Sequence, residues 1–273
     1  MREQSHSRTA RRHRHPSVMI DGVMTMFQGL VLLAVGVLGG VASTVASVAS
    51  VISYPALLAL GLPPLSANVT NTMSLVLTGA GSVLGSRPEL AGQRDRVVRL
   101  GVITALGGAA GAAVLLLAPA SAFGVVVPVL IGGAALLLLV QPMIRGLAPR
   151  PGAEQSRWRL AGVFGVAAYM GYFGAAAGVL MLAVLAAMIS ESLIKINAIK
   201  NAISGAANGV AALMFAAFAP VHWLFVPPLA AGFLLGGYTG PRLVRRLPVR
   251  ALRVIVALCG LALAVKLGAA AYR

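Results

Sequence analysis

The chain has 273 residues, of which 59% are hydrophobic and only 10% are charged, and its mean hydropathy is +0.90. A soluble protein carries roughly 25% charged residues, so this chain cannot cover a water-facing surface and is an integral membrane protein. The net charge of +16 sits in short basic stretches between apolar runs, which is typical of cytoplasmic loops, and the absence of interleaved aromatic residues argues against a nucleic-acid partner.

A polar, Arg-rich tail occupies residues 1–23, and the apolar runs that follow predict an all-α polytopic membrane protein. Residues 24–60 and 159–190 are apolar, but each is too long for one span, short for two, and interrupted by Gly, Ser and Thr. Each is therefore two short helices or one span with a re-entrant segment. Together with the ordinary runs they give about 8–10 membrane-embedded helices. The ordinary runs lie at 66–85, 97–118, 123–144, 196–218, 223–240 and 250–271.

Charge in the loops predicts the orientation of these segments. The loops at 119–122 and 219–222 lack Lys and Arg and are expected outside, whereas Arg clusters near 87–99, 145–159 and 242–253 are expected inside. The run at 66–85 then enters from outside and the run at 196–218 enters from inside, which is the signature of an inverted repeat. The predicted parts are the tail at 1–23, a first repeat at 24–144, a cytoplasmic linker at 145–158 and a second repeat at 159–273.

This orientation places the basic N-terminus outside, against the usual bias. Two explanations stay open: either the true start lies further along the chain, or residues 24–60 cross the membrane only once.

A polar stripe recurs in the two halves. A shift of 130 residues places Asn71, Ser74 and Thr78 on Asn201, Ser204 and Asn208. Spacings of three and four put each set on one helix face. One such stripe would suggest hydrogen bonding between packed helices, but two at corresponding places favour a transport pathway. The residues expected to bind substrate are Asn68, Asn71, Ser74, Lys200, Asn201 and Ser204.

Lys200 lies about 6 Å into its predicted span. It can snorkel to the inner interface, or it can project a cation toward the substrate, and both interpretations stay open. The six acidic residues all fall outside the spans, so the buried carboxylate typical of a cation pump is missing. Helix N-termini beside the stripes would also attract negative charge. An anionic or neutral substrate is therefore favoured.

Enzymatic chemistry has little support in this sequence. Cys259 is the single cysteine, and the four histidines lack zinc spacing. The spans hold no nucleophile–base–acid set, and the chain carries no P-loop motif. We therefore expect no enzyme activity, no metal and no other cofactor, and transport driven by a gradient or by the substrate itself.

Four segments carry a resemblance to a known family: "SYPALLALGLPPLSANVTNTMSL", "GSRPELAGQR", "GYFGAAAGVLML" and "INAIKNAISGAANGVAAL". They resemble the TauE/SafE family of sulfite and organosulfonate exporters over about residues 25–270. The resemblance implies a multi-pass secondary carrier of the bacterial inner membrane. It also implies a substrate that is a small sulfur-containing or related organic anion. The first broken region departs from the Gly-rich version of many members by using Ser43, Ser47 and Ser50.

The expected mechanism is alternating access, in which motion of the two halves exposes a site near the midplane to each side in turn. The expected partners are the small anionic substrate and the lipid bilayer, with a homodimer left open. The alternative is a passive, channel-like anion pore that uses the same stripes.

Overall fold

The computed structural model describes residues 24–46, 48–144, 156–243 and 249–271, so the predicted tail and most of the predicted linker lie outside the described residues. Over these ranges the chain is helical and contains no strand. The helices are α1 (Met26–Ala46), α2 (Ala49–Ala59), α3 (Pro64–Gly85), α4 (Arg87–Leu90), α5 (Arg94–Leu117), α6 (Ala120–Ile144), α7 (Arg157–Tyr172), α8 (Ala177–Met188), α9 (Leu193–Phe218), η2 (Trp223–Phe225), α10 (Val226–Leu243) and α11 (Val249–Ala271).

The all-α polytopic prediction is confirmed. Each ordinary apolar run is one helix, and each interrupted region is a pair of helices, α1 with α2 and α7 with α8. Three helical segments in the described residues are long and apolar enough to cross a membrane by length and composition, namely Met26–Thr44, Arg94–Leu117 and Leu193–Phe218. The short helices α2 and α8 have 11 and 12 residues, and each follows a break in the chain.

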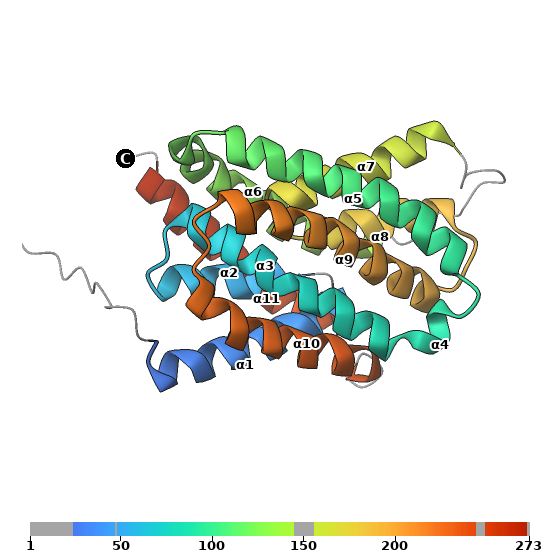
Figure 1. Cartoon of the computed structure of the whole chain (residues 1–273), viewed down its shortest axis with the longest axis horizontal. Helices are drawn as coiled ribbons and strands as arrows, with labels where there is room; N and C mark the ends of the chain where they lie inside the picture. The colour runs from blue at the N-terminus through green and yellow to red at the C-terminus, as the bar shows by residue number, and fades with distance from the viewer. Residues whose placement is uncertain (1–23, 47, 145–155, 244–248, 272–273) are drawn as a thin grey trace, which may run out of the picture.

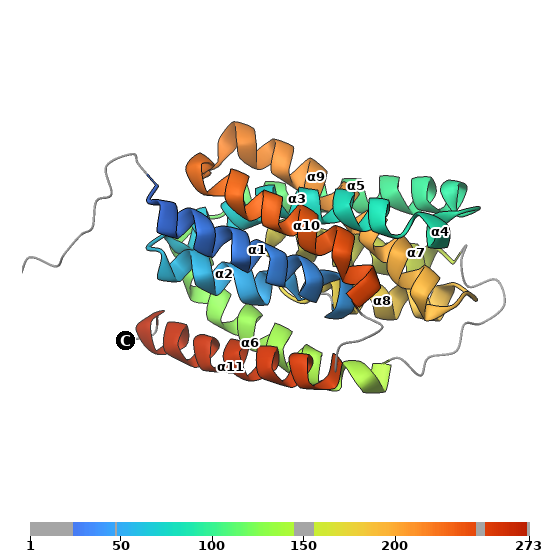
Figure 2. The same ribbon diagram turned by 90° about the horizontal axis from the view of Figure 1, so that it is seen from below.

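Helix packing is reciprocal between the two halves (Figures 1 and 2). Helix α1 packs against α10 as α7 packs against α5, and α10 packs against α3 as α5 packs against α9. Helices α3 and α9 pack against each other, and so do α6 and α11. Exchanging α1, α2, α3, α5 and α6 with α7, α8, α9, α10 and α11 therefore reproduces the main contacts. Figure 2 shows α6 and α11 as a pair along one side of the bundle.

The offset between the halves is 129 residues. Helix α3 begins at Pro64 and α9 at Leu193 (193 − 64 = 129), and α6 and α11 begin at residues 120 and 249, again 129 apart. Hydrogen bonds agree, because the Asn68 amide donates to the last residue of α7 and the Asn197 amide donates to a residue in the last turn of α1. The predicted offset of 130 is thus one residue too large.

Close glycine contacts support the same offset. A Cβ on Gly108 of α5 would lie 2.5 Å from the Ala207 carbonyl oxygen of α9. A Cβ on Gly237 of α10 would lie 2.7 Å from the Thr78 carbonyl oxygen of α3. Both pairs differ by 129 in number, so equivalent glycines bring equivalent helices together. With this offset Asn71 corresponds to Lys200, and Thr72 corresponds to Asn201.

Charged helix ends gather at one end of the bundle. The Arg-bearing beginnings of α5 and α7 and the Arg-bearing end of α10 lie at the end marked by α4 in Figure 1. The connections between α5 and α6 and between α9 and α10 lie at the opposite end. This is the separation of basic and non-basic loops that the positive-inside rule describes.

Candidate substrate-binding site

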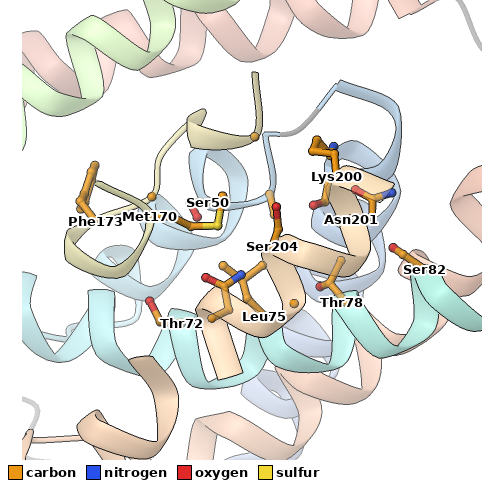
Figure 3. Close-up of a pocket in the computed structure, with 17 residues that line it drawn as sticks. Ser50, Thr72, Leu75, Thr78, Ser82, Met170, Phe173, Lys200, Asn201 and Ser204 are labelled. Carbon is orange, nitrogen blue, oxygen red and sulfur yellow. The ribbon is translucent and has the colours of Figure 1, made fainter. Parts of the chain in front are cut away.

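A cavity of about 60 Å³ lies where α3 and α9 cross, beside the breaks that precede α2 and α8. Figure 3 shows side chains along α3 and α9 converging on it from two sides. No acidic residue lines it within the described part of the chain. The polar lining residues are Ser43, Ser50, Thr72, Thr78, Ser82, Lys200, Asn201, Ser204 and Asn208.

Glycines hold the two crossing helices close together. A Cβ on Gly79 would lie 2.7 Å from the Cα of Gly205, so neither helix can carry a larger residue there without a shift. Thr78 and Ser204 adjoin these glycines in sequence and line the cavity. The small residues at the crossing therefore place hydroxyl groups of both repeats around one space.

Two half-length helices begin at the cavity. Ala49 and Ser50 in the first turn of α2 line it, and so does Gly178 in the first turn of α8. Gly174 and Ala176 take positive φ values of 74° and 54°, which turns the chain sharply into α8. First-turn N–H groups have no intrahelical partner, and the N-terminal end of a helix carries a partial positive charge. Both half-helices thus direct positive potential toward the cavity.

Buried polar atoms of the lining lack hydrogen-bond partners in the described part of the chain. They are Asn201 Nδ2, Ser204 Oγ, Thr78 Oγ1 and Ser82 Oγ. An unsatisfied buried polar group costs about 1–3 kcal/mol. Native proteins keep such groups where something else, such as a ligand or a water molecule, completes their hydrogen bonds. The amide N–H and the hydroxyl protons can all be donated to an oxyanion.

Lys200 adds a cation to this space. Its side chain is only 2% exposed, and it lines the cavity. The structure therefore favours the second interpretation of this lysine, because a snorkelling side chain would reach the surface. Figure 3 shows Lys200 and Asn201 next to each other on α9. A cation among neutral donors makes the cavity suited to an anion.

Three of the six predicted site residues, Lys200, Asn201 and Ser204, line the cavity. Asn68 and Ser74 do not, since Asn68 Nδ2 donates to the Tyr172 carbonyl at 3.0 Å and Ser74 Oγ donates to the Thr70 carbonyl at 2.9 Å.

Asn71 also lies outside the lining, bonded to two serines of α2. The α3 face that lines the cavity carries Thr72, Leu75, Thr78 and Ser82 instead.

The sequence contained a signal for this register. The segments "LGGAAG" at 106–111 and "LGGYTG" at 235–240 match at an offset of 129. Their glycines make the equivalent contacts described above. With that offset Thr72, rather than Asn71, pairs with Asn201. Met170 and Phe173, which also line the cavity, come from the second break and carry no comparable signal.

An aromatic cluster forms the wall of the cavity at Phe173. The Phe173 ring packs edge-on against Tyr54, with ring centroids 5.4 Å apart, and against Phe123 at 5.9 Å. Phe123 also contacts Tyr172 at 5.9 Å. Tyr54, Phe123 and Phe173 are each at most 2% exposed. These rings join α2, α6 and the break after α7 into one closed apolar layer.

A polar network at the basic end of the bundle links the two repeats. Glu191, between α8 and α9, accepts hydrogen bonds from Lys195 at 3.1 Å and from Gln93 at 3.2 Å. Arg96 Nη1 lies 3.9 Å from the same carboxylate. The hydrogen bonds from Lys195 and Gln93 hold the pKa of Glu191 below its ordinary value. The connection before α5 is thereby fastened to the start of α9.

Comparison with known families gives one match. A family model described as "Sulfite exporter TauE/SafE" matches residues 32–267. No curated protein matches the chain, and no solved structure matches it.

Proposed function

Because the chain belongs to the sulfite exporter TauE/SafE family, we propose that it is a secondary transporter, an exporter or permease rather than an enzyme, that moves small anions by alternating access. The proposed substrates are sulfite, organosulfonates or related organic acids. The proposed location is the inner membrane of a bacterial cell, with the Arg-bearing end of the bundle facing the cytoplasm.

The observation that carries this proposal is the set of unpartnered donors around Lys200. Asn201 and Ser204 of one repeat and Thr78 and Ser82 of the other direct polar groups into a single cavity. A cavity of about 60 Å³ holds several water-sized groups, since one water needs roughly 10–15 Å³ by this measure. That volume suits a sulfite ion or the head group of a sulfonate.

Alternating access is supported by the reciprocal packing of the two halves. Two repeats of opposite orientation can exchange conformations, so that a site between them opens to one side and then to the other. The cavity lies at the α3–α9 crossing, where a relative movement of the repeats would change its access.

A passive pore is the second candidate, because the same donors could line a continuous path. The buried aromatic layer at Phe173 favours a carrier, since it closes one wall of the cavity with well-packed rings. Carrier and pore differ in one measurable property: a carrier shows saturable flux with counterflow of labelled substrate, and a pore does not.

The test uses purified protein in lipid vesicles. Uptake and efflux of sulfite, a sulfonate and a carboxylate are measured while the pH gradient is varied. We expect saturable flux of at least one anion, and its loss in Asn201→Leu. A matched control is Thr239→Val, because Thr239 is exposed on α10 and its hydroxyl bonds only to its own helix. Wild-type flux in folded Asn201→Leu would refute the site.

A further inference from the structure

Asn71 is buried directly behind the cavity rather than in it. Its side chain is 1% exposed. Asn71 Nδ2 donates to Ser50 Oγ at 3.1 Å, and Ser53 Oγ donates to Asn71 Oδ1 at 2.6 Å. Of these three residues only Ser50 lines the cavity. The asparagine of α3 therefore holds two hydroxyl groups of α2 through one amide.

The hydrogen count at Ser50 follows from this arrangement. A serine hydroxyl has one proton to donate and two lone pairs that accept. Because Ser50 Oγ accepts a hydrogen bond from Asn71, its own proton is left for another acceptor. The side chain lines the cavity, so an anion bound there is the acceptor within reach.

The orientation of the Asn71 amide decides where that proton goes. In the reversed orientation the amide oxygen would face Ser50 and accept its proton. Ser53 would then give its proton to the Ala49 carbonyl, which lies 3.0 Å from Ser53 Oγ. The bond from Ser53 to Asn71 Oδ1 opposes this reversal. Ser53 thus sets the amide, and the amide sets Ser50.

We propose that Asn71 is a positioning residue, which keeps the Ser50 hydroxyl proton available to the transported anion. The proposal rests on the proposed function and concerns the same cavity. Asn71 acts through Ser50 and does not touch the substrate.

The two repeats contribute differently to the anion site under this proposal. Ser50 is the second residue of α2, and the second residue of α8 is Gly178, which also lines the cavity but has no side chain to donate. The position equivalent to Asn71 in the second repeat is Lys200. The first repeat therefore supplies an indirectly oriented hydroxyl where the second supplies a cation.

A double-mutant cycle tests the proposal, because residues that act through one another show non-additive effects. Sulfite flux into vesicles is measured for wild type, Ser50→Ala, Asn71→Leu and the double variant. The readouts are KM, the concentration that gives half the maximal flux, and the maximal flux itself. We expect each single change to raise KM roughly tenfold, the loss of one charge-assisted hydrogen bond. In the Ser50→Ala background, Asn71→Leu should change KM less than twofold. An equal rise of KM in both backgrounds would overturn the proposal.

Two further variants keep the test sharp where Asn71→Leu does not fold. Ser53→Ala removes the hydroxyl that fixes the amide while leaving the cavity lining intact, and it should raise KM only when Ser50 is present. Ser50→Thr keeps a hydroxyl and should restore most of the affinity lost in Ser50→Ala. Unchanged KM in folded Ser53→Ala would contradict the relay.

Failure of the proposed function gives a different result. A wild-type protein that moves no anion of the panel would refute the function. A wild-type carrier with an additive cycle would refute only the role of Asn71.

Discussion

Gly79 and Gly205 face each other where α3 crosses α9, so closely that a Cβ on Gly79 would lie 2.7 Å from the Gly205 Cα. The cavity lies beside this contact, lined by the adjoining Thr78 and Ser204. The separation of the two helices, and hence the size of the cavity, is thus set by residues without side chains.

Gly79→Ala should separate α3 from α9. The added methyl group meets backbone rather than a flexible side chain, and such overpacking costs about 1–3 kcal/mol. We expect a lower unfolding temperature in detergent and at least a tenfold loss of flux. Gly209→Ala is the control, because a Cβ there meets nothing within 4 Å. Equal behaviour of the two variants would show that the crossing is not sterically limited.

Ser204→Ala should weaken anion binding without destabilising the protein. The Ser204 hydroxyl is buried without a partner in the described residues, so its removal relieves an unsatisfied group of about 1–3 kcal/mol. We expect an unfolding temperature equal to or above that of wild type in the absence of anion. The rise on adding sulfite should be smaller than in wild type. A fall in the anion-free unfolding temperature would mean that the hydroxyl has a structural role.

Lys200→Met should abolish stabilisation by anions. Methionine keeps much of the apolar stem of lysine but removes the cation that lines the cavity. We expect no change of unfolding temperature on addition of sulfite, together with loss of flux. Lys266→Met is the matched control, because Lys266 is an exposed lysine in α11. Sulfite stabilisation that persisted in Lys200→Met would place the anion elsewhere.

Much of the fold was predictable because apolar length is a strong signal in a membrane. The ordinary runs became single helices, and the interrupted runs became the α1–α2 and α7–α8 pairs. Helix ends were less predictable where charge continues a helix beyond the apolar run. Helix α5 begins at Arg94, whereas its predicted span begins at 97, since charged residues form helix as readily once they leave the hydrocarbon.

The site was only half predictable because side-chain identity misled the alignment of the repeats. Matching Asn71 with Asn201 pairs like with like, but backbone packing pairs Asn71 with Lys200. The second repeat supplied its residues correctly, since Lys200, Asn201 and Ser204 line the cavity. In the first repeat a one-residue error rotated the predicted face by about 100°, away from Thr72 and toward Asn71.

Glu191→Gln should reduce the acid sensitivity of the protein. Hydrogen bonds from Lys195 and Gln93 lower the pKa of Glu191. A lowered pKa in the folded state stabilises the protein above the ordinary Glu value of about 4.3, and that stabilisation is lost as the pH falls through the lowered pKa. We expect the unfolding temperature of Glu191→Gln to vary less than that of wild type between about pH 3 and 6. Asp95→Asn is the control on the same surface, and an identical pH profile for Glu191→Gln and wild type would remove the network from the account.

Phe173→Leu should make the transporter leaky. The Phe173 ring lines the cavity and contacts both Tyr54 and Phe123, so a smaller side chain opens the aromatic layer at its centre. A Phe-to-Leu change at such a position costs only a few kcal/mol at most, which leaves the protein folded. We expect anion efflux that no longer depends on substrate on the opposite side, and a loss of counterflow. Phe164→Leu is the matched control, because Phe164 is 40% exposed on α7. Counterflow retained in Phe173→Leu would mean that the barrier between the two sides lies elsewhere, whereas its absence already in wild type would establish the pore instead of the carrier.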